Sequence, residues 1–191
     1  MLCALAALAL LSAPAAPGRA PVLPAGRWEL EQSHSSVIAE ALHLGVSYYV
    51  MRFDRMQASF TWNPADPAAT KLQASVDVTS LDTGDAFGPR AADDFLAAQK
   101  YPEARFVSTK VEEAPDGRTG TVTGDLTLMG VTRPVTFDVT FVGVGPGLLF
   151  GTVAGFSATT VIHRSDFGSR HFLSFVGDDV RLQIEGEFKR K

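Results

Sequence analysis

The chain has 191 residues, of which 46% are hydrophobic and 20% are charged, and its formal net charge is −4. This length and composition are typical of one globular domain. The sequence contains no basic cluster, which argues against nucleic acid as a partner and against electrostatic docking on anionic lipid. It contains 13 Phe but only 2 Trp and 3 Tyr. Because Phe carries no polar atom, this aromatic surface requires a dry environment.

Residues 1–20 are predicted to form a signal peptide. An Ala/Leu run over residues 2–12 precedes small residues and prolines, and it is too short to span a bilayer. A buried N-terminal helix is the alternative. The one cysteine, Cys3, would leave with the leader. We therefore expect a periplasmic or secreted mature chain, residues 21–191, that forms one domain without an integral membrane segment.

The first part of the mature chain is predicted to be a series of strands. Apolar and polar residues alternate in each run, and turn-forming residues separate the runs. The strands are expected at 27–31, 37–43, 46–53, 60–62 and 72–79.

Residues 80–101 interrupt this pattern. A short helix is predicted over 95–100, with Asp93 or Asp94 as its N-cap and Pro102 as its end. A strand over 106–111 follows.

Residues 121–142 are predicted to form a β-hairpin, because apolar residues occupy every second position. Those of the inward parity are Val122, Leu126, Leu128, Val135, Phe137, Val139 and Phe141. The link 129–134 contains Gly130, which tolerates positive φ, and Pro134, which suits the start of the returning strand.

Strands at 149–162 and 180–185 complete the chain. About seven to nine strands at this spacing, with one short helix, predict an all-β, closed antiparallel barrel. A β-sandwich is the alternative.

Several stretches, in order, resemble the YceI-like family of periplasmic, lipocalin-like isoprenoid-binding proteins. They are His34-Ser35, His43-Leu44-Gly45, Ser80-Leu81-Asp82-Thr83, Asp94-Phe95, Lys100-Tyr101-Pro102, Phe106, the run from Gly124 to Val135, Arg164 to Gly168, and Val176 to Val180. They span about residues 27–188. The chain departs from the family pattern at Met51 and Ala58, where the family usually has Gly, and in the segment 83–95, where Arg90 alone remains of the usual Arg-Asp-His-Leu run.

The resemblance implies an eight-stranded barrel around an elongated apolar pocket that holds a polyisoprenoid or other long-chain amphiphile. The candidate ligand-binding residues are Phe53, Phe60, Phe106, Leu126, Leu128, Phe137, Phe141 and Phe156 inside the barrel, with His43 and Arg164 at its rim. The inward phenylalanines could equally fill a core, since small barrels either pack their interior or hold one ligand. Small inward residues (Ala39, Ala41 and Ala74) leave room and favour a cavity.

Both rim residues have a structural alternative. His43 is more simply explained as a rim histidine bonded to backbone than as a headgroup contact, and Arg164 as a clamp on Asp166 or on backbone, with Gly168 at an unusual φ. The four histidines lack the spacing of metal ligands on one element, so no metal or other cofactor is expected. No Gly-x-Ser-x-Gly elbow supports a hydrolase.

These observations predict non-enzymatic binding of a polyisoprenoid, isoprenoid quinone or fatty amphiphile, for transport, storage or sequestration. One alternative is a filled-barrel interaction protein, and a weaker one is an enzyme that acts on a lipid headgroup. The expected partner is a hydrophobic small molecule or lipid and not nucleic acid. A homodimer formed through a strand edge or the rim is compatible with this fold.

Overall fold

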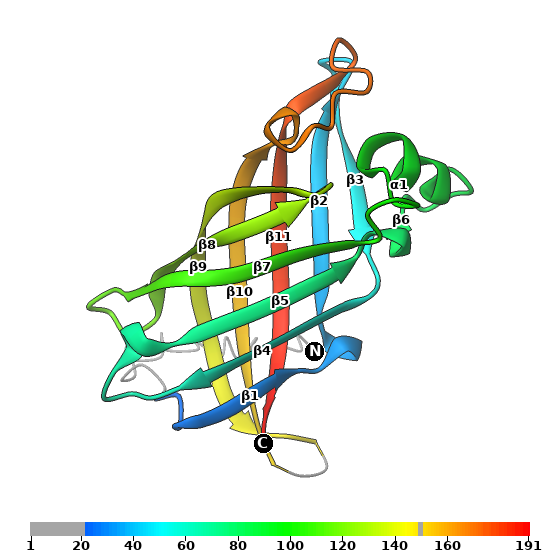
Figure 1. Cartoon of the computed structure of the whole chain (residues 1–191). Coiled ribbons are helices and arrows are strands. Elements are labelled where there is room, and N and C mark those ends of the chain that lie inside the picture. Colours follow the sequence, from blue (N-terminus) through cyan, green and yellow to red (C-terminus); the bar gives the residue numbers. More distant parts are fainter. Residues whose placement is uncertain (1–21, 149–150) are drawn as a thin grey trace, which may run out of the picture.

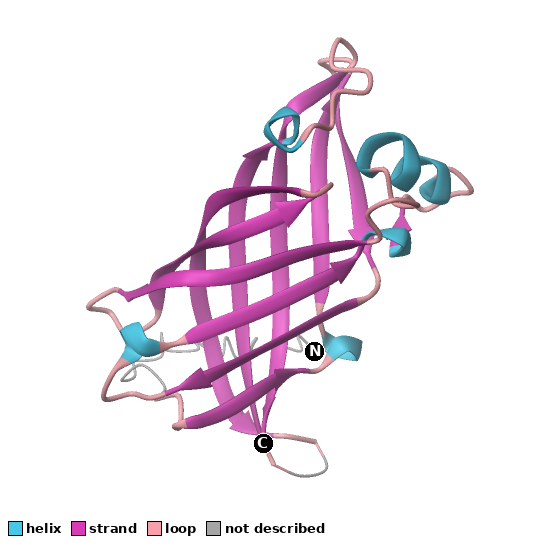
Figure 2. Ribbon diagram, viewed as in Figure 1, coloured by secondary structure: helices cyan, strands magenta, loops and turns pink. Residues whose placement is uncertain are grey.

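The computed structural model describes residues 22–148 and 151–191 (Figure 1). Antiparallel strands make up most of it, and one α-helix, α1 (Gly88–Leu96), lies at one end (Figure 2). The strands are β1 (Gly26–Leu30), β2 (Ser36–His43), β3 (Ser47–Phe53), β4 (Met56–Trp62), β5 (Lys71–Asp77), β6 (Leu81–Asp82), β7 (Glu103–Glu113), β8 (Thr119–Leu128), β9 (Val131–Pro146), β10 (Thr152–His163) and β11 (Val176–Arg190). Short 3₁₀ turns lie at η1 (Gln32–His34), η2 (Pro67–Ala69), η3 (Val78–Ser80) and η4 (Arg164–Phe167).

Strand β11 closes the sheet because one of its edges has two partners. Its first part, Val176–Glu185, pairs with β2, and its last part, Phe188–Arg190, pairs with β1. Its other edge pairs with β10. The ring therefore runs β1-β4-β5-β7-β8-β9-β10-β11 and returns to β1 (Figure 1). This confirms the eight-stranded antiparallel barrel and excludes the sandwich.

Ser35 bridges the point where the chain passes from β1 through η1 into β2. Its hydroxyl donates to the carbonyl oxygen of Glu31 (2.8 Å) and accepts from the backbone N–H of Glu187 in β11 (3.1 Å). These bonds use backbone groups that the interrupted ladder would leave unpaired, and Ser35 is buried. One edge of β11 can thus serve both strands.

The β2–β3 hairpin extends the barrel wall at the end opposite the C-terminus (Figure 1). β3 pairs with β6, and α1 packs against β6 and η3. The buried residues of this contact are Val78, Leu81, Ala91, Ala92 and Ala98. The helix therefore covers the side of the β2–β3–β6 extension, which is not part of the closed ring of eight strands.

The helix prediction was wrong in its position. α1 contains Pro89 in its first turn, where the missing N–H is tolerated, so Asp93 and Asp94 lie inside the helix and do not cap its start. The helix ends where Ala97 adopts a left-handed φ of 48°, before Pro102 is reached.

The central hairpin forms as predicted, with a tighter turn. Met129 and Gly130 join β8 to β9, and both have positive φ (52° and 76°), as in a type I′ turn. Pro134 therefore lies within β9, opposite Asp125, and not at its start. Its missing N–H is tolerated because the pairing of β9 with β10 begins at Asp138.

Two expectations fall outside the described residues. The signal peptide expected over 1–20 is one, and the first two residues of the strand expected at 149–162 are the other; the rest of that strand is β10. In the described part of the chain, none of the helices has the length and hydropathy needed to cross a membrane.

Gly124 allows the Phe106 ring to lie across β8. A Cβ atom at Gly124 would come within 2.5 Å of Phe106 Cζ and would also overlap the carbonyl oxygen of Val107. The ring thereby reaches Phe137 of β9, with the two ring centroids 5.2 Å apart and the ring planes at 85°.

We expect Gly124→Val to lower the free energy of unfolding by about 1–3 kcal/mol, because the new side chain overpacks this contact. Gly143→Val is the matched control in a neighbouring strand, since an added Cβ there meets nothing within 4 Å. The control should change stability by less than about 0.5 kcal/mol. Urea denaturation measures both, and equal losses would contradict the role assigned to Gly124.

Candidate functional site

Two cavities lie inside the barrel. The aromatic cavity, of about 510 Å³, lies toward β1, and the helix-end cavity, of about 560 Å³, lies toward α1. Among the described residues, none lines both. Each volume is within the range of about 300–1,000 Å³ that is usual for small-molecule sites. Each is also far larger than the voids of a close-packed interior.

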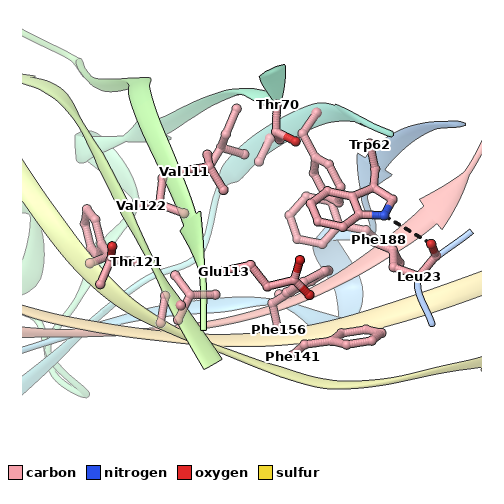
Figure 3. A pocket seen from close by; sticks show the side chains of 18 of the residues that line it. Leu23, Trp62, Thr70, Val111, Glu113, Thr121, Val122, Phe141, Phe156 and Phe188 are labelled. Atoms are coloured by element: carbon pink, nitrogen blue, oxygen red, sulfur yellow. Dashed lines mark hydrogen bonds between the residues drawn. The ribbon is translucent and has the colours of Figure 1, made fainter. Parts of the chain in front are cut away.

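The aromatic cavity is walled by phenylalanine rings (Figure 3). Phe60 meets Phe156 and Phe188 edge to face, with centroid distances of 5.8 and 5.1 Å. Phe141 stacks on Phe156 at 5.2 Å. These edge-to-face and stacked contacts between the rings hold the wall in place and leave the space beside it unfilled.

Few polar groups face the aromatic cavity. Trp62 Nε1 donates to the carbonyl oxygen of Leu23 (3.1 Å), which leaves the apolar face of the indole for the cavity (Figure 3). The Oγ1 atom of Thr70 is buried and has no hydrogen-bond partner in the described part of the chain. Glu113, from the β7–β8 hairpin, is exposed where it lines the cavity. The cavity therefore favours an apolar guest.

The helix-end cavity has room because small residues face it from several elements. Ala39, Ala41, Ala91 and Ala104 line it. Its outer part is aromatic and aliphatic, formed by Leu44, Phe87, Phe95, Phe172 and Phe175. Its polar side chains are His43, Tyr49, Arg164 and Ser169.

The boundary between the cavities crosses the barrel at the Phe106–Phe137 pair. On β7, Phe106 lines the aromatic cavity and Ala104 lines the helix-end cavity. On β11, Ile184 and Leu182 divide in the same way. Phe106 and Phe137 are both buried. A guest longer than one cavity must displace these rings.

All ten predicted ligand-binding residues line a cavity, but they do not line the same one. The aromatic cavity includes Phe60, Phe106, Phe137, Phe141 and Phe156. The helix-end cavity includes His43, Phe53, Leu126, Leu128 and Arg164. The structure thus divides what the family resemblance implied to be one elongated pocket, and contact of these residues with a ligand stays a prediction.

Arg164 clamps backbone carbonyl groups, which confirms the clamp that the sequence offers as the alternative to a headgroup contact. Its Nε donates to the carbonyl oxygen of Gly177 (2.9 Å), Nη2 to that of Val176 (2.8 Å) and Nη1 to that of Ser169 (3.1 Å). Burial lowers the pKa of the guanidinium below its ordinary value, and the nearby Asp178 carboxylate opposes this. The expected turn glycine after η4 has a φ of 91°.

Asp178 completes the clamp. It accepts from the backbone N–H and the hydroxyl of Ser165, at 2.8 and 2.7 Å. Burial opposes ionisation of this carboxyl, but the two bonds from Ser165 hold its pKa below the ordinary value. The two motifs that flank this loop, at Arg164 and at Gly177, therefore fix it to the barrel.

His43 lies at the rim with the inward parity that the alternation predicts. It lines the helix-end cavity, is exposed, and its ring lies 6.4 Å from that of Tyr49. Two other histidines pair with carboxylates, His34 with Glu187 (3.0 Å) and His163 with Asp179 (2.8 Å). Over residues 22–148 and 151–191, no three His, Cys, Asp or Glu side chains are grouped as metal ligands would be.

Sequence reasoning missed several residues that line the cavities. Phe188 continues the alternation of Val180, Leu182 and Ile184 through Gly186, so that signal was present. Phe172 and Phe175 lie in an irregular loop. No periodicity marks such residues, and only their tertiary position places them at the cavity.

The family model and the related sequences indicate the same family for this chain. A family model for the YceI-like domain matches residues 28–188. A UPF0312 protein of Pseudomonas putida (strain W619) is 44% identical over 140 residues, which is 72% of each chain. A UPF0312 protein of Vibrio parahaemolyticus is 39% identical over 156 residues, covering 81% of this chain and 82% of that protein.

Solved structures agree in fold. BcnA of Burkholderia cenocepacia superposes with a TM-score of 0.72 at 29% identity, over 83% of this chain and 98% of that one. A polyisoprenoid binding domain from Saccharophagus degradans has a TM-score of 0.64 at 16% identity, over 86% and 98% of the two chains, which shows a shared fold alone. The match of the family model to nearly all of the described barrel, together with these relatives, shows that the chain belongs to the YceI-like family.

Proposed function

We propose that this protein binds one long-chain apolar ligand, such as a polyisoprenoid, isoprenoid quinone or fatty amphiphile, along the inside of its barrel. The observation that carries the proposal is the pair of apolar cavities inside one barrel, whose boundary is formed by the side chains of Phe106 and Phe137 and not by backbone. Each methylene taken from water contributes about 0.8 kcal/mol, so a long chain would bind tightly with few polar contacts. The polyisoprenoid binding domain of the same fold is consistent with this class of ligand.

The proposed role is carriage, storage or sequestration of this lipid in the periplasm, without catalysis. The apolar leader expected at residues 1–20 supports that location. The filled-barrel alternative requires a packed interior, whereas the two cavities have volumes of about 510 and 560 Å³. That comparison favours the binding role.

Mass spectrometry of the purified protein, under native and then denaturing conditions, tests the proposal directly. We expect a lipid bound at one molecule per chain that is released on denaturation, and its mass identifies the ligand class. A ligand-free mass, followed by no uptake of isoprenoid or fatty amphiphiles, would overturn the proposal.

Substitutions that fill one cavity should each impair binding if one chain spans both. Ala158→Phe places a ring in the aromatic cavity and Ala41→Phe places one in the helix-end cavity. Each should weaken uptake of a fluorescent long-chain probe by about ten-fold or more, since the ring takes the volume of several methylenes. Full affinity in either variant would confine the ligand to the other cavity.

Adjacent positions on the outer face supply the controls. Thr159→Phe and Leu42→Phe add rings next to the same two alanines, at exposed positions of β10 and β2. Neither should change probe affinity by more than about two-fold, because exposed sites have small effects. Loss of binding in these controls would mean that Ala158→Phe and Ala41→Phe lower affinity by disturbing the barrel and not by filling a cavity.

The hydrogen bonds of Arg164 predict that a lysine at this position would destabilise the loop 169–177. Arg164→Lys supplies one ammonium where three carbonyl oxygens now receive separate donors. We expect the free energy of unfolding to fall by about 1.5–3 kcal/mol, and amides of residues 169–177 to exchange faster with deuterium. Unchanged stability with lost ligand affinity would instead assign Arg164 to the polar end of the ligand.

A further inference from the structure

One end of the barrel exposes a cluster of apolar side chains, which we call the tip. It comprises Leu44 and Val46 from the β2–β3 turn, and Phe172, Leu173 and Phe175 from the loop after η4. Their exposed fractions are 55%, 80%, 55%, 39% and 56%. Figure 1 shows the hairpin in cyan and the loop in orange together at the end opposite the C-terminus. Single exposed apolar residues are ordinary, but a contiguous group indicates a surface that meets a partner.

One backbone hydrogen bond joins the two segments of the tip, and another shapes the loop. The backbone N–H of Leu44 donates to the carbonyl oxygen of Phe175 (2.7 Å), and the N–H of Phe175 donates to that of Phe172 (2.9 Å). The rings of Phe172 and Phe175 lie 6.2 Å apart. The clamp of Arg164 on Ser169, Val176 and Gly177 fixes both ends of the loop. The tip is therefore one built surface.

The tip is continuous with the helix-end cavity. Leu44, Phe172 and Phe175 line the cavity and are also more than half exposed. A hydrocarbon chain could therefore pass between the cavity and the surroundings of the tip while it stays against apolar side chains. A route of this kind is useful only when the surroundings are themselves apolar.

The charges around the tip suit a lipid headgroup layer. Residues 43–49 and 169–176 contain no Asp or Glu, so insertion would desolvate no carboxylate. Below the tip, Arg181 lies over the exposed ring of Tyr48, with the guanidinium carbon 4.3 Å from the centroid. Tyr and Arg at the base of an apolar surface are typical of the membrane–water interface.

We infer that the tip inserts into the outer part of a lipid bilayer, and that the ligand enters and leaves the helix-end cavity there; the second part rests on the proposed function. A lipid surface fits better than a second copy of the chain, because a stable dimer buries about 800 Å² on each partner over a broad surface, and the tip is the narrow end of the molecule. Since the chain carries no basic cluster, apolar burial drives the insertion, and added salt leaves it in place.

Sedimentation with phosphatidylcholine vesicles at 0.1 and 0.5 M NaCl tests this inference. The variants are Val46→Glu in the tip and Val142→Glu, which adds the same charge at a 59% exposed position of β9. Neither valine lines a cavity. Val46→Glu should lower the vesicle partition coefficient by about ten-fold or more, and Val142→Glu should keep it within about two-fold. Both variants contain residues 1–21, so any effect of this segment on vesicle binding is the same in the two proteins.

Uptake of N-phenyl-1-naphthylamine from vesicle-free solution separates docking from ligand binding. Both variants should take up this probe like the unaltered protein. If neither the unaltered protein nor the two variants take up the probe, but vesicle binding still depends on Val46, membrane docking is supported and the proposed function is overturned. If the unaltered protein does not bind vesicles, or if both variants lose binding equally, docking is overturned.

Two further measurements serve as controls for folding and for the site of insertion. Val46→Ser repeats the sedimentation experiment without an added charge, in case the glutamate disturbs folding. In a separate experiment, the tryptophan fluorescence of Val46→Trp should shift to shorter wavelength when vesicles are added, whereas that of Val142→Trp should not. If sedimentation velocity shows a dimer that Val46→Glu dissociates, and vesicles do not bind, the tip is an interface between copies of this chain and the inference is wrong.

Discussion

The pairing of one strand edge with two different strands is the constraint on which the rest of this molecule depends. β11 pairs with β2 over its first part and with β1 over its last, and Ser35 bridges the transition. Without the β1–β11 pairs the sheet would stay open, and the inward side chains of β4, β5 and β7 would face solvent. Closure also makes the two ends unlike. One end is a complete ring, and the other is a hairpin with α1 beside it (Figure 2).

This asymmetry explains why the interior contains two cavities and not a uniform core. In the closed ring several phenylalanines that contact one another line the cavity. Toward α1 alanines from several elements lie among aliphatic residues and leave room there. Gly124 sets the boundary, because its missing side chain lets Phe106 cross β8 and meet Phe137. A barrel of this size can hold one ligand or pack itself, and here the choice lies with a few side chains of contrasting size.

The open end is organised by hydrogen bonds that join the two ends of the loop after η4. Arg164 binds carbonyl groups on both sides of the loop 169–177, and Asp178 binds Ser165 in return. Because these donors and acceptors satisfy one another, the loop can present exposed aromatic rings and still keep a defined shape. The same clamp therefore supports the outer wall of the helix-end cavity and the apolar tip, which joins the proposed ligand site to the proposed contact with a bilayer.

The sequence by itself determined most of the strands and their inward faces, because a period of two and turn-forming residues are local properties of the chain, and its ordered motifs indicated the family. The short strand β6 was not predicted. Phe60, Phe137 and Leu128 were placed inside the barrel on that basis, and all three line a cavity. The start of α1 was misplaced because Asp93 and Asp94 resemble a cap, whereas Pro89 and the φ of Ala97 set the true limits. Only the tertiary structure decided that the interior is divided at Phe106 and that Phe172 and Phe175 stand at its opening. These facts depend on distances between residues far apart in the chain, and no local pattern encodes such distances.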